Sequence, residues 1–366
     1  MAYAEQAART EVEPPTLSTN TTETRIPQAA ILAFERGGIG AVGKTFEEGE
    51  WITPQLDELM FSIFSRPRRK RESLRWEMLR AVLPHFLFNL QSERRAFEIA
   101  EGHYDLGNDL FEVMLDRSMT YTCGYWKEAQ NLQEAQEAKL KLACDKLDLR
   151  PGMRVLDVGC GWGNFAEYAA RRHGVSVVGL TVSKEQSAFA ERRCQNLPVQ
   201  ILLQDYRQHR GSYDRIVSLE MIEAVGRKNM KQFYAWAANC LRPQGHFLVQ
   251  AISADTISRT SPVSLDEFFV WIEKNIFPNG YLPTITELTT VNHSKLIVRH
   301  IEEFGSSYDR TLLAWSENFE RGWSRLESKY SMQFKRRWSF YLNSCAALFR
   351  IGGVQLYQVL YSKGRE

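Results

Sequence analysis

The sequence lacks several patterns that would assign the chain to a particular class of protein. It contains no apolar run of about 18 residues, so no segment is expected to span a membrane. Its six cysteines include no CxxC pair, which argues against a zinc site or a disulfide framework and favours free thiols in the cytoplasm. The net charge is only +2, without the basic excess typical of nucleic-acid-binding proteins. No metal and no nucleic-acid partner are therefore expected.

The N-terminal quarter differs in composition from the rest of the chain. Residues 1–25 have few large apolar side chains and no pattern of a secretory signal, so we expect a disordered tail. Residues 26–96 show short helical patterns interrupted by glycine and predict a small helical domain, with a turn at Gly37–Gly40. Residues 97–366 form the larger remaining domain.

From Gly152 onward, short β-branched runs alternate with helical stretches such as Lys184–Gln195 and Lys228–Leu241. This alternation predicts an α/β fold with a mostly parallel sheet covered by helices on both faces. After the fifth strand the chain continues with an insertion over 254–295, which is predicted to cap a substrate. Aromatic-rich helices over 309–350 and a last strand follow. The predicted strands are Val155–Val158, Val175–Leu180, Val199–Leu203, Ile216–Leu219, Phe247–Ile252 and Val354–Tyr361.

The clearest chemical motif is Asp157-Val158-Gly159-Cys160-Gly161-Trp162-Gly163, directly after the first of these strands. Glycines at such a turn let the backbone pass close to a ligand. The spacing differs from the GxGxxG of dinucleotide sites, and Asp157 would repel a phosphate. S-adenosylmethionine has a sulfonium and no phosphate, so Asp157, Gly159 and Gly161 are predicted to bind it. The alternative is a tight structural turn.

Polar residues follow the next two strands. Thr181 and Gln186 follow the second strand, where Ser183 and Gln186 also have the spacing of a capping box. Gln204 and Asp205 follow the third, where Asp205 is expected to meet the adenine amine and Tyr206 to cover its ring. Consecutive strands of an open α/β sheet bind ligands at their carboxyl ends, so these residues are predicted to share one crevice. A helix cap and ordinary loop residues are the alternative interpretation.

The chain resembles the cyclopropane-fatty-acyl-phospholipid synthases, relatives of the mycolic acid methyltransferases. The resemblance covers roughly residues 30 to 366. It implies a Rossmann-like methyltransferase fold with a mostly parallel seven-stranded sheet, and it adds Tyr121 and Thr122 to the cofactor-binding residues. The motifs that carry it, beyond the glycine motif, are His103–Phe111, Tyr121–Trp126, Met221–Gly226, Ile276–Gly280 and Phe304–Asp309.

In the family that the chain resembles, a bicarbonate ion lies at the reacting carbon. By resemblance it would be held by Cys123, Glu223, Tyr308 and the backbone of Ile252. A histidine usually completes this site, and here the matching residue is Gln250, which can donate a hydrogen bond but cannot accept a proton near neutral pH.

Glu220 and Gln250 look more like the matching residues in the plant-type branch of the family. Glu220 is interpreted as a solvated or cofactor-facing carboxylate, and a catalytic role is the alternative. The aromatic residues Tyr308, Trp315, Phe268, Phe269 and Trp271 are candidates to stabilise a carbocation, although most such side chains belong to a core.

The resemblance implies transfer of a methylene carbon onto the cis double bond of an unsaturated phospholipid acyl chain. A methyl-branched or methylene product, a small-amine N-methyltransferase and a non-catalytic binding protein are the alternatives. The basic run that begins at Arg66 and includes Arg68, Arg69, Lys70 and Arg71 suggests that residues 26–96 dock on an anionic membrane surface. A solvated charge run is the other interpretation. A homodimer, peripherally bound to the inner face of the membrane, is also expected.

Overall fold

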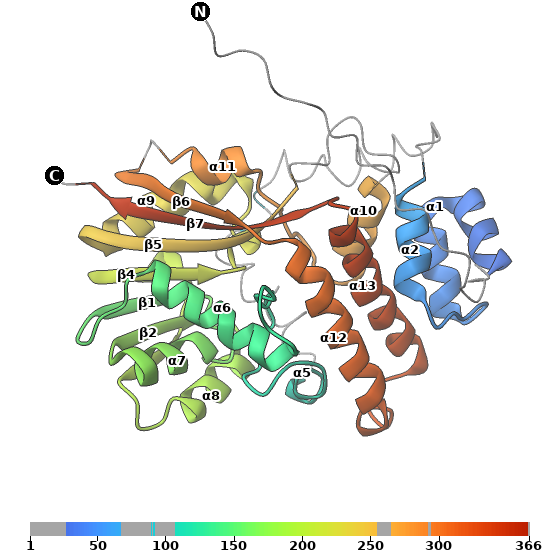
Figure 1. Ribbon diagram of the computed structural model, residues 1–366, viewed down its shortest axis with the longest axis horizontal. Coiled ribbons are helices and arrows are strands. Elements are labelled where there is room, and N and C mark those ends of the chain that lie inside the picture. Colours follow the sequence, from blue (N-terminus) through green and yellow to red (C-terminus); the bar gives the residue numbers. More distant parts are fainter. Residues whose placement is uncertain are drawn as a thin grey trace, which may run out of the picture.

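The computed structural model describes residues 27–66, 89, 91, 107–254, 265–291 and 294–364. In this part of the chain, seven strands form one sheet with the order β3-β2-β1-β4-β5-β7-β6 (Figure 1). The pairs from β3 to β5 are parallel, whereas β7 is antiparallel to both β5 and β6. The strands are β1 (Arg154–Val158), β2 (Ser176–Thr181), β3 (Val199–Leu203), β4 (Tyr213–Leu219), β5 (Leu241–Ser253), β6 (Leu296–Glu303) and β7 (Gln355–Lys363).

The predicted α/β fold is confirmed, and six of the seven strands lie where the β-branched runs place them. The sequence interpretation missed β6, whose segment Leu296–Glu303 has mostly exposed or half-buried residues. It pairs with β7 alone, at the edge of the sheet, so it lacks the continuous apolar run of a buried strand. An exposed edge strand therefore gave no clear signal of its own.

Helices cover both faces of the sheet, because neighbouring side chains of each strand point to opposite faces. On one face Leu140 of α6 (Leu132–Lys146) and Phe165 of α7 (Asn164–His173) pack against β1 and β4. On the other face Phe233 of α9 (Met230–Cys240) and Leu288 of α11 (Ile285–Thr289) pack in a second apolar core. The helix α8 (Lys184–Arg193) packs along β2 and β3.

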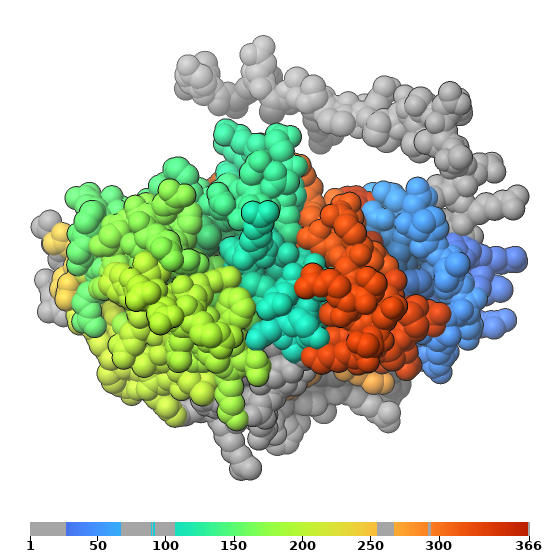
Figure 2. All heavy atoms as spheres, turned by 90° about the horizontal axis from the view of Figure 1, so that it is seen from below, coloured from blue at the N-terminus to red at the C-terminus, as the bar shows by residue number. Residues whose placement is uncertain are grey.

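The remaining helices form a layer beside the sheet. The long helices α12 (Ser306–Gly322) and α13 (Met332–Arg350) pack against each other, and α5 (Asn108–Met114) packs on α12. In Figure 2 the segment that contains α5, coloured teal, lies between the green sheet region and the orange-red helices. The short 3-10 helices are Tyr206–Gln208, Ile222–Ala224, Arg227–Asn229 and Trp323–Arg325.

The N-terminal helices α1 (Gln28–Glu48) and α2 (Leu56–Phe64) pack against α13 on the side away from the sheet (Figure 1). The turn expected at the glycines is a kink inside α1, where Gly38 has φ 68° and ψ −157°. Phe64 packs edge-on against Phe268 of α10 (Leu265–Asn275), with 5.4 Å between ring centroids.

These two helices thus share one apolar core with the C-terminal helices. The domain boundary proposed at 96/97, and most of the basic run after Arg66, lie outside the described residues. The division of the chain into a tail, a helical domain and a larger domain therefore stays a prediction.

Candidate active site

The glycine motif forms the turn between β1 and α7. Gly159 and Gly161 have φ angles of 80° and 53°, a left-handed region that favours glycine. A Cβ on Gly159 would lie 2.6 Å from Cγ of Met221, whereas one on Gly161 would meet nothing within 4 Å. Gly159 therefore allows a close approach to the loop after β4, and Gly161 leaves open space beside the turn.

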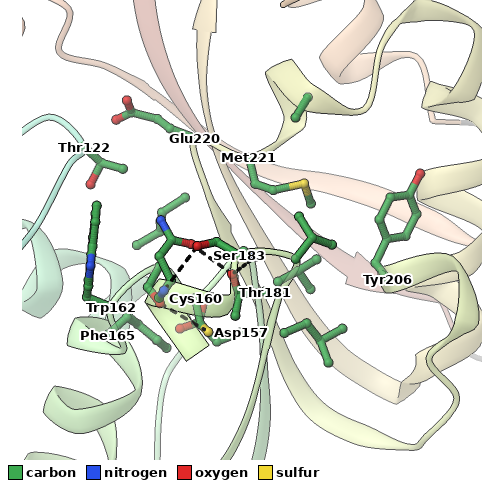
Figure 3. A pocket seen from close by; sticks show the side chains of 18 of the residues that line it. Thr122, Asp157, Cys160, Trp162, Phe165, Thr181, Ser183, Tyr206, Glu220 and Met221 are labelled. Atoms are coloured by element: carbon green, nitrogen blue, oxygen red, sulfur yellow. Dashed lines mark hydrogen bonds between the residues drawn. The ribbon is translucent and has the colours of Figure 1, made fainter. Parts of the chain in front are cut away.

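The nine residues that the sequence predicts for cofactor binding all line a single cavity at the carboxyl ends of the strands. Figure 3 shows Asp157, Thr181 and Ser183 together at its base, Trp162 and Phe165 on one side, and Tyr206 on the opposite side. The lining includes Tyr121, Thr122, Asp157, Gly159, Gly161, Thr181, Gln186, Gln204 and Asp205. The prediction that the residues after successive strands share one crevice is thus confirmed.

Asp157 has the electrostatic character of a residue that binds a cation. Its side chain is buried, and its Oδ2 atom has no hydrogen-bond partner among the described residues. Burial raises the pKa of Asp157 to about 7, while the charge of Lys139 opposes the rise. A ligand that brings hydrogen-bond donors or a positive charge would satisfy this oxygen.

The polar residues after β2 and β3 hold one another in place. The Thr181 hydroxyl donates to Oε1 of Gln186 at 2.9 Å, and Ser183 caps α8 by accepting from the Gln186 N–H. Asp205 is already paired with Arg207, whose Nε and Nη2 donate to its two oxygens at 2.8 and 2.7 Å. Asp205 therefore lines the cavity but has lone pairs already engaged, so its contact with an adenine amine stays a prediction.

Lys139 of α6 is a cavity residue that the sequence interpretation did not identify. Its side chain is fully buried, and its Nζ donates to the Thr122 hydroxyl at 3.0 Å. Burial lowers the pKa of Lys139 to about 8, against the attraction of Glu220 and Asp116. One lysine in a polar helix carries no distinguishing signal, because only the packing of α6 on the sheet buries it.

A second group of side chains meets at the end of β4, around the carboxylate of Glu220. The Cys123 N–H donates to Oε1 at 2.9 Å, and Nε2 of Gln250 donates to the same oxygen at 2.5 Å. The Tyr308 hydroxyl donates to Oε2 at 2.5 Å. Glu220 thus brings together three residues that were predicted for the reacting centre. The sequence interpretation favoured a solvated or cofactor-facing role for Glu220 over a catalytic one.

Figure 3 shows the Glu220 side chain beside Thr122 at the rim of the cavity, away from Tyr206. Burial raises the pKa of Glu220, and the hydrogen bonds from Tyr308, Cys123 and Gln250 oppose this rise. The three donors stabilise the charged form of this carboxylate and so act against the effect of burial.

The other predicted pair, Glu223 and Ile252, also meets. The Ile252 N–H donates to Oε1 of Glu223 at 2.7 Å, while Oε2 is buried without a partner among the described residues. Burial and the negative charge of Glu220 raise the pKa of Glu223 to about 8. Of the two neighbouring carboxyl groups, Glu223 is therefore the one that is mainly neutral at pH 7.

The segment around Cys123 is anchored on α12 by Thr311, another residue that the sequence interpretation missed. The Thr311 hydroxyl accepts from the Gly124 N–H at 3.1 Å and from Nε1 of Trp126 at 2.8 Å. The Cys123 thiol is fully buried, and its pKa is raised well above the ordinary value by burial and by Glu220. Cys123 thus contributes its backbone N–H and has no nucleophilic role.

The aromatic candidates fall into two groups. Tyr308 stacks on Phe349 at 4.4 Å and lies edge-on to Trp315 at 6.1 Å, so both Tyr308 and Trp315 are close to the Glu220 group. Phe268 and Trp271 stack on each other in the core that holds the N-terminal helices. Phe269 is partly buried and packs against that core.

Among the residues that the structure describes, no group of three or more His, Cys, Asp or Glu side chains is arranged to hold a metal ion. None of the described helices has the length and apolar character that crossing a membrane requires.

The sheet order, the glycine turn and the cavity at the carboxyl ends of the strands define an S-adenosylmethionine-dependent methyltransferase of Rossmann-like fold. The same architecture occurs in the mycolic acid cyclopropane synthase CmaA1 complexed with SAH and CTAB, which is 32% identical with a TM-score of 0.70. That match covers 73% of this chain and 98% of the other. Coclaurine N-methyltransferase, at 19% identity and TM-score 0.70 over 89% of this chain and 99% of the other, shares the fold.

Sequence comparison identifies the family. The family model "Mycolic acid cyclopropane synthetase" matches residues 91–359. The Escherichia coli cyclopropane-fatty-acyl-phospholipid synthase is 44% identical over 340 residues, which cover 91% of this chain and 85% of that protein. The Mycobacterium tuberculosis cyclopropane mycolic acid synthase MmaA2 is 35% identical over 73% of this chain and 97% of its own length. The chain belongs to the mycolic acid cyclopropane synthetase family.

The glycine turn gives a test of the cofactor cavity. Gly161→Val would place a branched side chain in the open space of the cavity, so S-adenosylhomocysteine should bind about ten-fold more weakly or worse by calorimetry. Gly152→Val is the matched control, because Gly152 also has positive φ (82°) and open surroundings but does not line the cavity. Equal affinity in the two variants would contradict the assignment.

The pKa of Glu223 predicts a pH dependence of stability. Its pKa rises from an ordinary 4.5 to about 8 in the folded protein. Between these values the folded protein keeps a proton that the unfolded chain releases, so this group's contribution to stability decreases as the pH rises. The Tm of Glu223→Gln, which does not titrate, should therefore depend less on pH between pH 5 and 8 than that of the unmodified protein. Parallel Tm curves would refute the shifted pKa, and the exposed Glu112→Gln is the control.

Proposed function

We propose that the protein transfers a methylene carbon from S-adenosylmethionine to the cis double bond of an unsaturated phospholipid acyl chain, giving a cyclopropane fatty acid. The observation that carries this proposal is that a methyltransferase cavity lies next to two half-buried, hydrogen-bonded carboxyl groups, Glu220 and Glu223, at the end of β4. The 44% identity to the Escherichia coli cyclopropane-fatty-acyl-phospholipid synthase supports the same substrate class.

The cavity residues fit S-adenosylmethionine. The unpartnered Oδ2 of Asp157 suits a cationic or amino-donating ligand, and a side chain on Gly161 would intrude on the cavity. Thr181, Gln186, Gln204 and Asp205 would hold the nucleoside part, and Tyr121 and Thr122 would close the cavity toward Glu220. The cofactor supplies a methyl group on a positively charged sulfur.

The chemistry requires a dry site with a base. The alkene π electrons attack the methyl carbon and leave a carbocation on the acyl chain. Loss of a proton from the new methyl group then closes the three-membered ring. Tyr308 and Trp315 present aromatic rings near the Glu220 group and can stabilise the cation, and their burial excludes the water that would trap it.

Bicarbonate, which the family resemblance implies, stays a prediction. The donors that would hold it are the backbone N–H groups of Cys123 and Ile252 and the side chains of Gln250 and Tyr308. In this structure these groups already donate to Glu220 or Glu223. The residues therefore do not fit an added anion in this arrangement.

A methyl-branched or methylene fatty acyl product remains an alternative outcome of the same carbocation, and a small-amine N-methyltransferase is the alternative from another substrate class. The homology to acyl-chain-modifying enzymes favours a lipid substrate over an amine. Both alternatives predict a labelled product that differs in mass or structure from a cyclopropane fatty acid.

The activity can be tested directly. Incubation with methyl-labelled S-adenosylmethionine and vesicles of a cis-monounsaturated phospholipid should give a fatty acid that is one CH₂ heavier and has lost the alkene, as seen by mass spectrometry and NMR. Vesicles of the saturated phospholipid are the control and should yield no labelled lipid. A retained alkene, or label only in added amines, would contradict the proposal.

We also propose that the protein is cytoplasmic and binds peripherally to the inner face of the membrane, as a homodimer. The motivation is the basic run that begins at Arg66, most of which lies outside the described residues, and the insolubility of the substrate. Each basic residue near an anionic surface contributes about 1 kcal/mol to binding.

Charge reversal tests this membrane association. Changing Arg68, Arg69, Lys70 and Arg71 to Glu should weaken sedimentation with phosphatidylglycerol vesicles, and added salt should weaken that of the unmodified protein. A control variant reverses four basic residues that lie elsewhere in the chain and are exposed, Lys141, Arg150, Lys184 and Arg321. Equal, salt-independent sedimentation of both variants and the unmodified protein would disprove the docking role.

A further inference from the structure

Glu220 is held in a backbone conformation that is unusual for its residue type. Its φ angle is 55°, in the left-handed region that a residue with a Cβ adopts at a cost of about 1–2 kcal/mol. Its own N–H donates to the Gln250 carbonyl at 2.8 Å, directly past the end of β4. Such strain persists where the surrounding structure over-determines the position, as it does here through three hydrogen bonds to one carboxylate.

A carboxylate and a bicarbonate ion present the same planar pair of anionic oxygens. Three of the groups that the family resemblance assigns to the ion, in Cys123, Gln250 and Tyr308, donate instead to Glu220. The fourth, the Ile252 N–H, donates to Glu223. We propose that the carboxylate of Glu220 replaces bicarbonate and is itself the base that removes the proton during ring closure.

This proposal rests on the proposed cyclopropanation, in which each C–C bond that forms takes its electron pair from a bond that breaks. The π electrons form the new bond to the methyl carbon, and the electrons of the S–C bond remain on sulfur, which becomes neutral. One C–H bond of the added methyl group then breaks, its proton goes to a Glu220 oxygen, and its electron pair forms the third C–C bond of the ring. The protonated Glu220 releases its proton to solvent before the next turnover. No further reagent is required.

A chain of hydrogen bonds explains why residue 250 is Gln. The ammonium group of Lys146 can only donate hydrogen bonds, and its Nζ donates to Oε1 of Gln358 at 2.7 Å. Nε2 of Gln358 then donates to Oε1 of Gln250 at 2.8 Å, and Gln250 is left with its NH₂ group toward Glu220. The register of β5 and β7 pairs the two glutamines directly, and Glu302 balances Lys146 at 2.6 Å.

The direction of these hydrogen bonds makes the NH₂ group of Gln250 a donor to the carboxylate of Glu220. Gln250 and Gln358 are therefore positioning residues that favour the ionised form of Glu220. A carboxyl group must be ionised before it can accept a proton. The three donors favour the ionised form of Glu220, whereas the neighbouring Glu223 is mainly neutral, so the two carboxyl groups are suited to different tasks. The Glu220 side chain also lines the cavity in which the reaction would occur.

The occupancy of the site can be tested without any turnover. Glu220→Gly removes the carboxylate and suits the left-handed backbone, so ¹³C-bicarbonate should bind to this variant, as seen by NMR line broadening, and not to the unmodified protein. Gln244→Gly is the matched control, because exposed Gln244 also has positive φ (63°). Binding of bicarbonate to the unmodified protein at millimolar concentration would overturn the proposal, whatever the lipid substrate.

Turnover gives the second test, with the unsaturated phospholipid as substrate. Glu220→Gln should lower kcat by about 10²–10⁴-fold, the usual contribution of a general base, with S-adenosylhomocysteine affinity and Tm nearly unchanged. Added bicarbonate or formate should partly restore Glu220→Gly but not Glu220→Gln, and carbonate-free buffer should leave the unmodified protein fully active. Gln250→Leu should move the acidic limb of the pH–rate profile to higher pH, because Glu220 loses a donor.

The outcomes separate the two proposals. A Glu220→Gln variant that keeps activity within a few-fold, or an unmodified protein that slows without bicarbonate, would overturn the role of Glu220 while the proposed function stands. Bicarbonate that binds only to Glu220→Gly, in a protein without any cyclopropane product, would support the replacement of the ion and contradict the proposed function.

Discussion

The arrangement of the active site depends on one half-buried carboxylate. Glu220, at the end of β4, accepts hydrogen bonds from the segment at Cys123, from Gln250 on β5 and from Tyr308 on α12. These three donors are far apart in the sequence and belong to different layers of the fold. Because these donors come from separate elements and meet at one carboxylate, Glu220 links the sheet to the helical layer.

The charges around the cavity compensate one another. Lys139 is fully buried and lies close enough to Asp157, Glu220 and Asp116 for its charge to lower the cost of burying carboxylates. The pKa of Asp157 is about 7 and that of Glu223 about 8, so neither carries a full charge at neutral pH without a ligand. A cationic cofactor would complete this balance, because it supplies positive charge next to Asp157.

The helical layer also positions residues of the active site. Thr311 and Tyr308, one turn apart on α12, bind the segment around Cys123 and the Glu220 carboxylate respectively. The same layer packs against α1 and α2 in one apolar core, so the N-terminal helices are coupled through α13 to the helix that holds the site. A membrane surface that contacts the N-terminal region would therefore act on elements that contact the site directly.

The sequence by itself determined the α/β fold and the cofactor cavity. Strand order and the residues that follow each strand specify one edge of a sheet, so seven of the cavity residues, from Asp157 to Asp205, could be predicted from the pattern, and the family resemblance added Tyr121 and Thr122. The tertiary structure alone revealed that Glu220 accepts the hydrogen bonds of Cys123, Gln250 and Tyr308, and that Lys139 is buried. A hydrogen bond between residues 88 or 97 positions apart leaves no periodic pattern, because it depends on the packing of α12 and β5 around the end of β4.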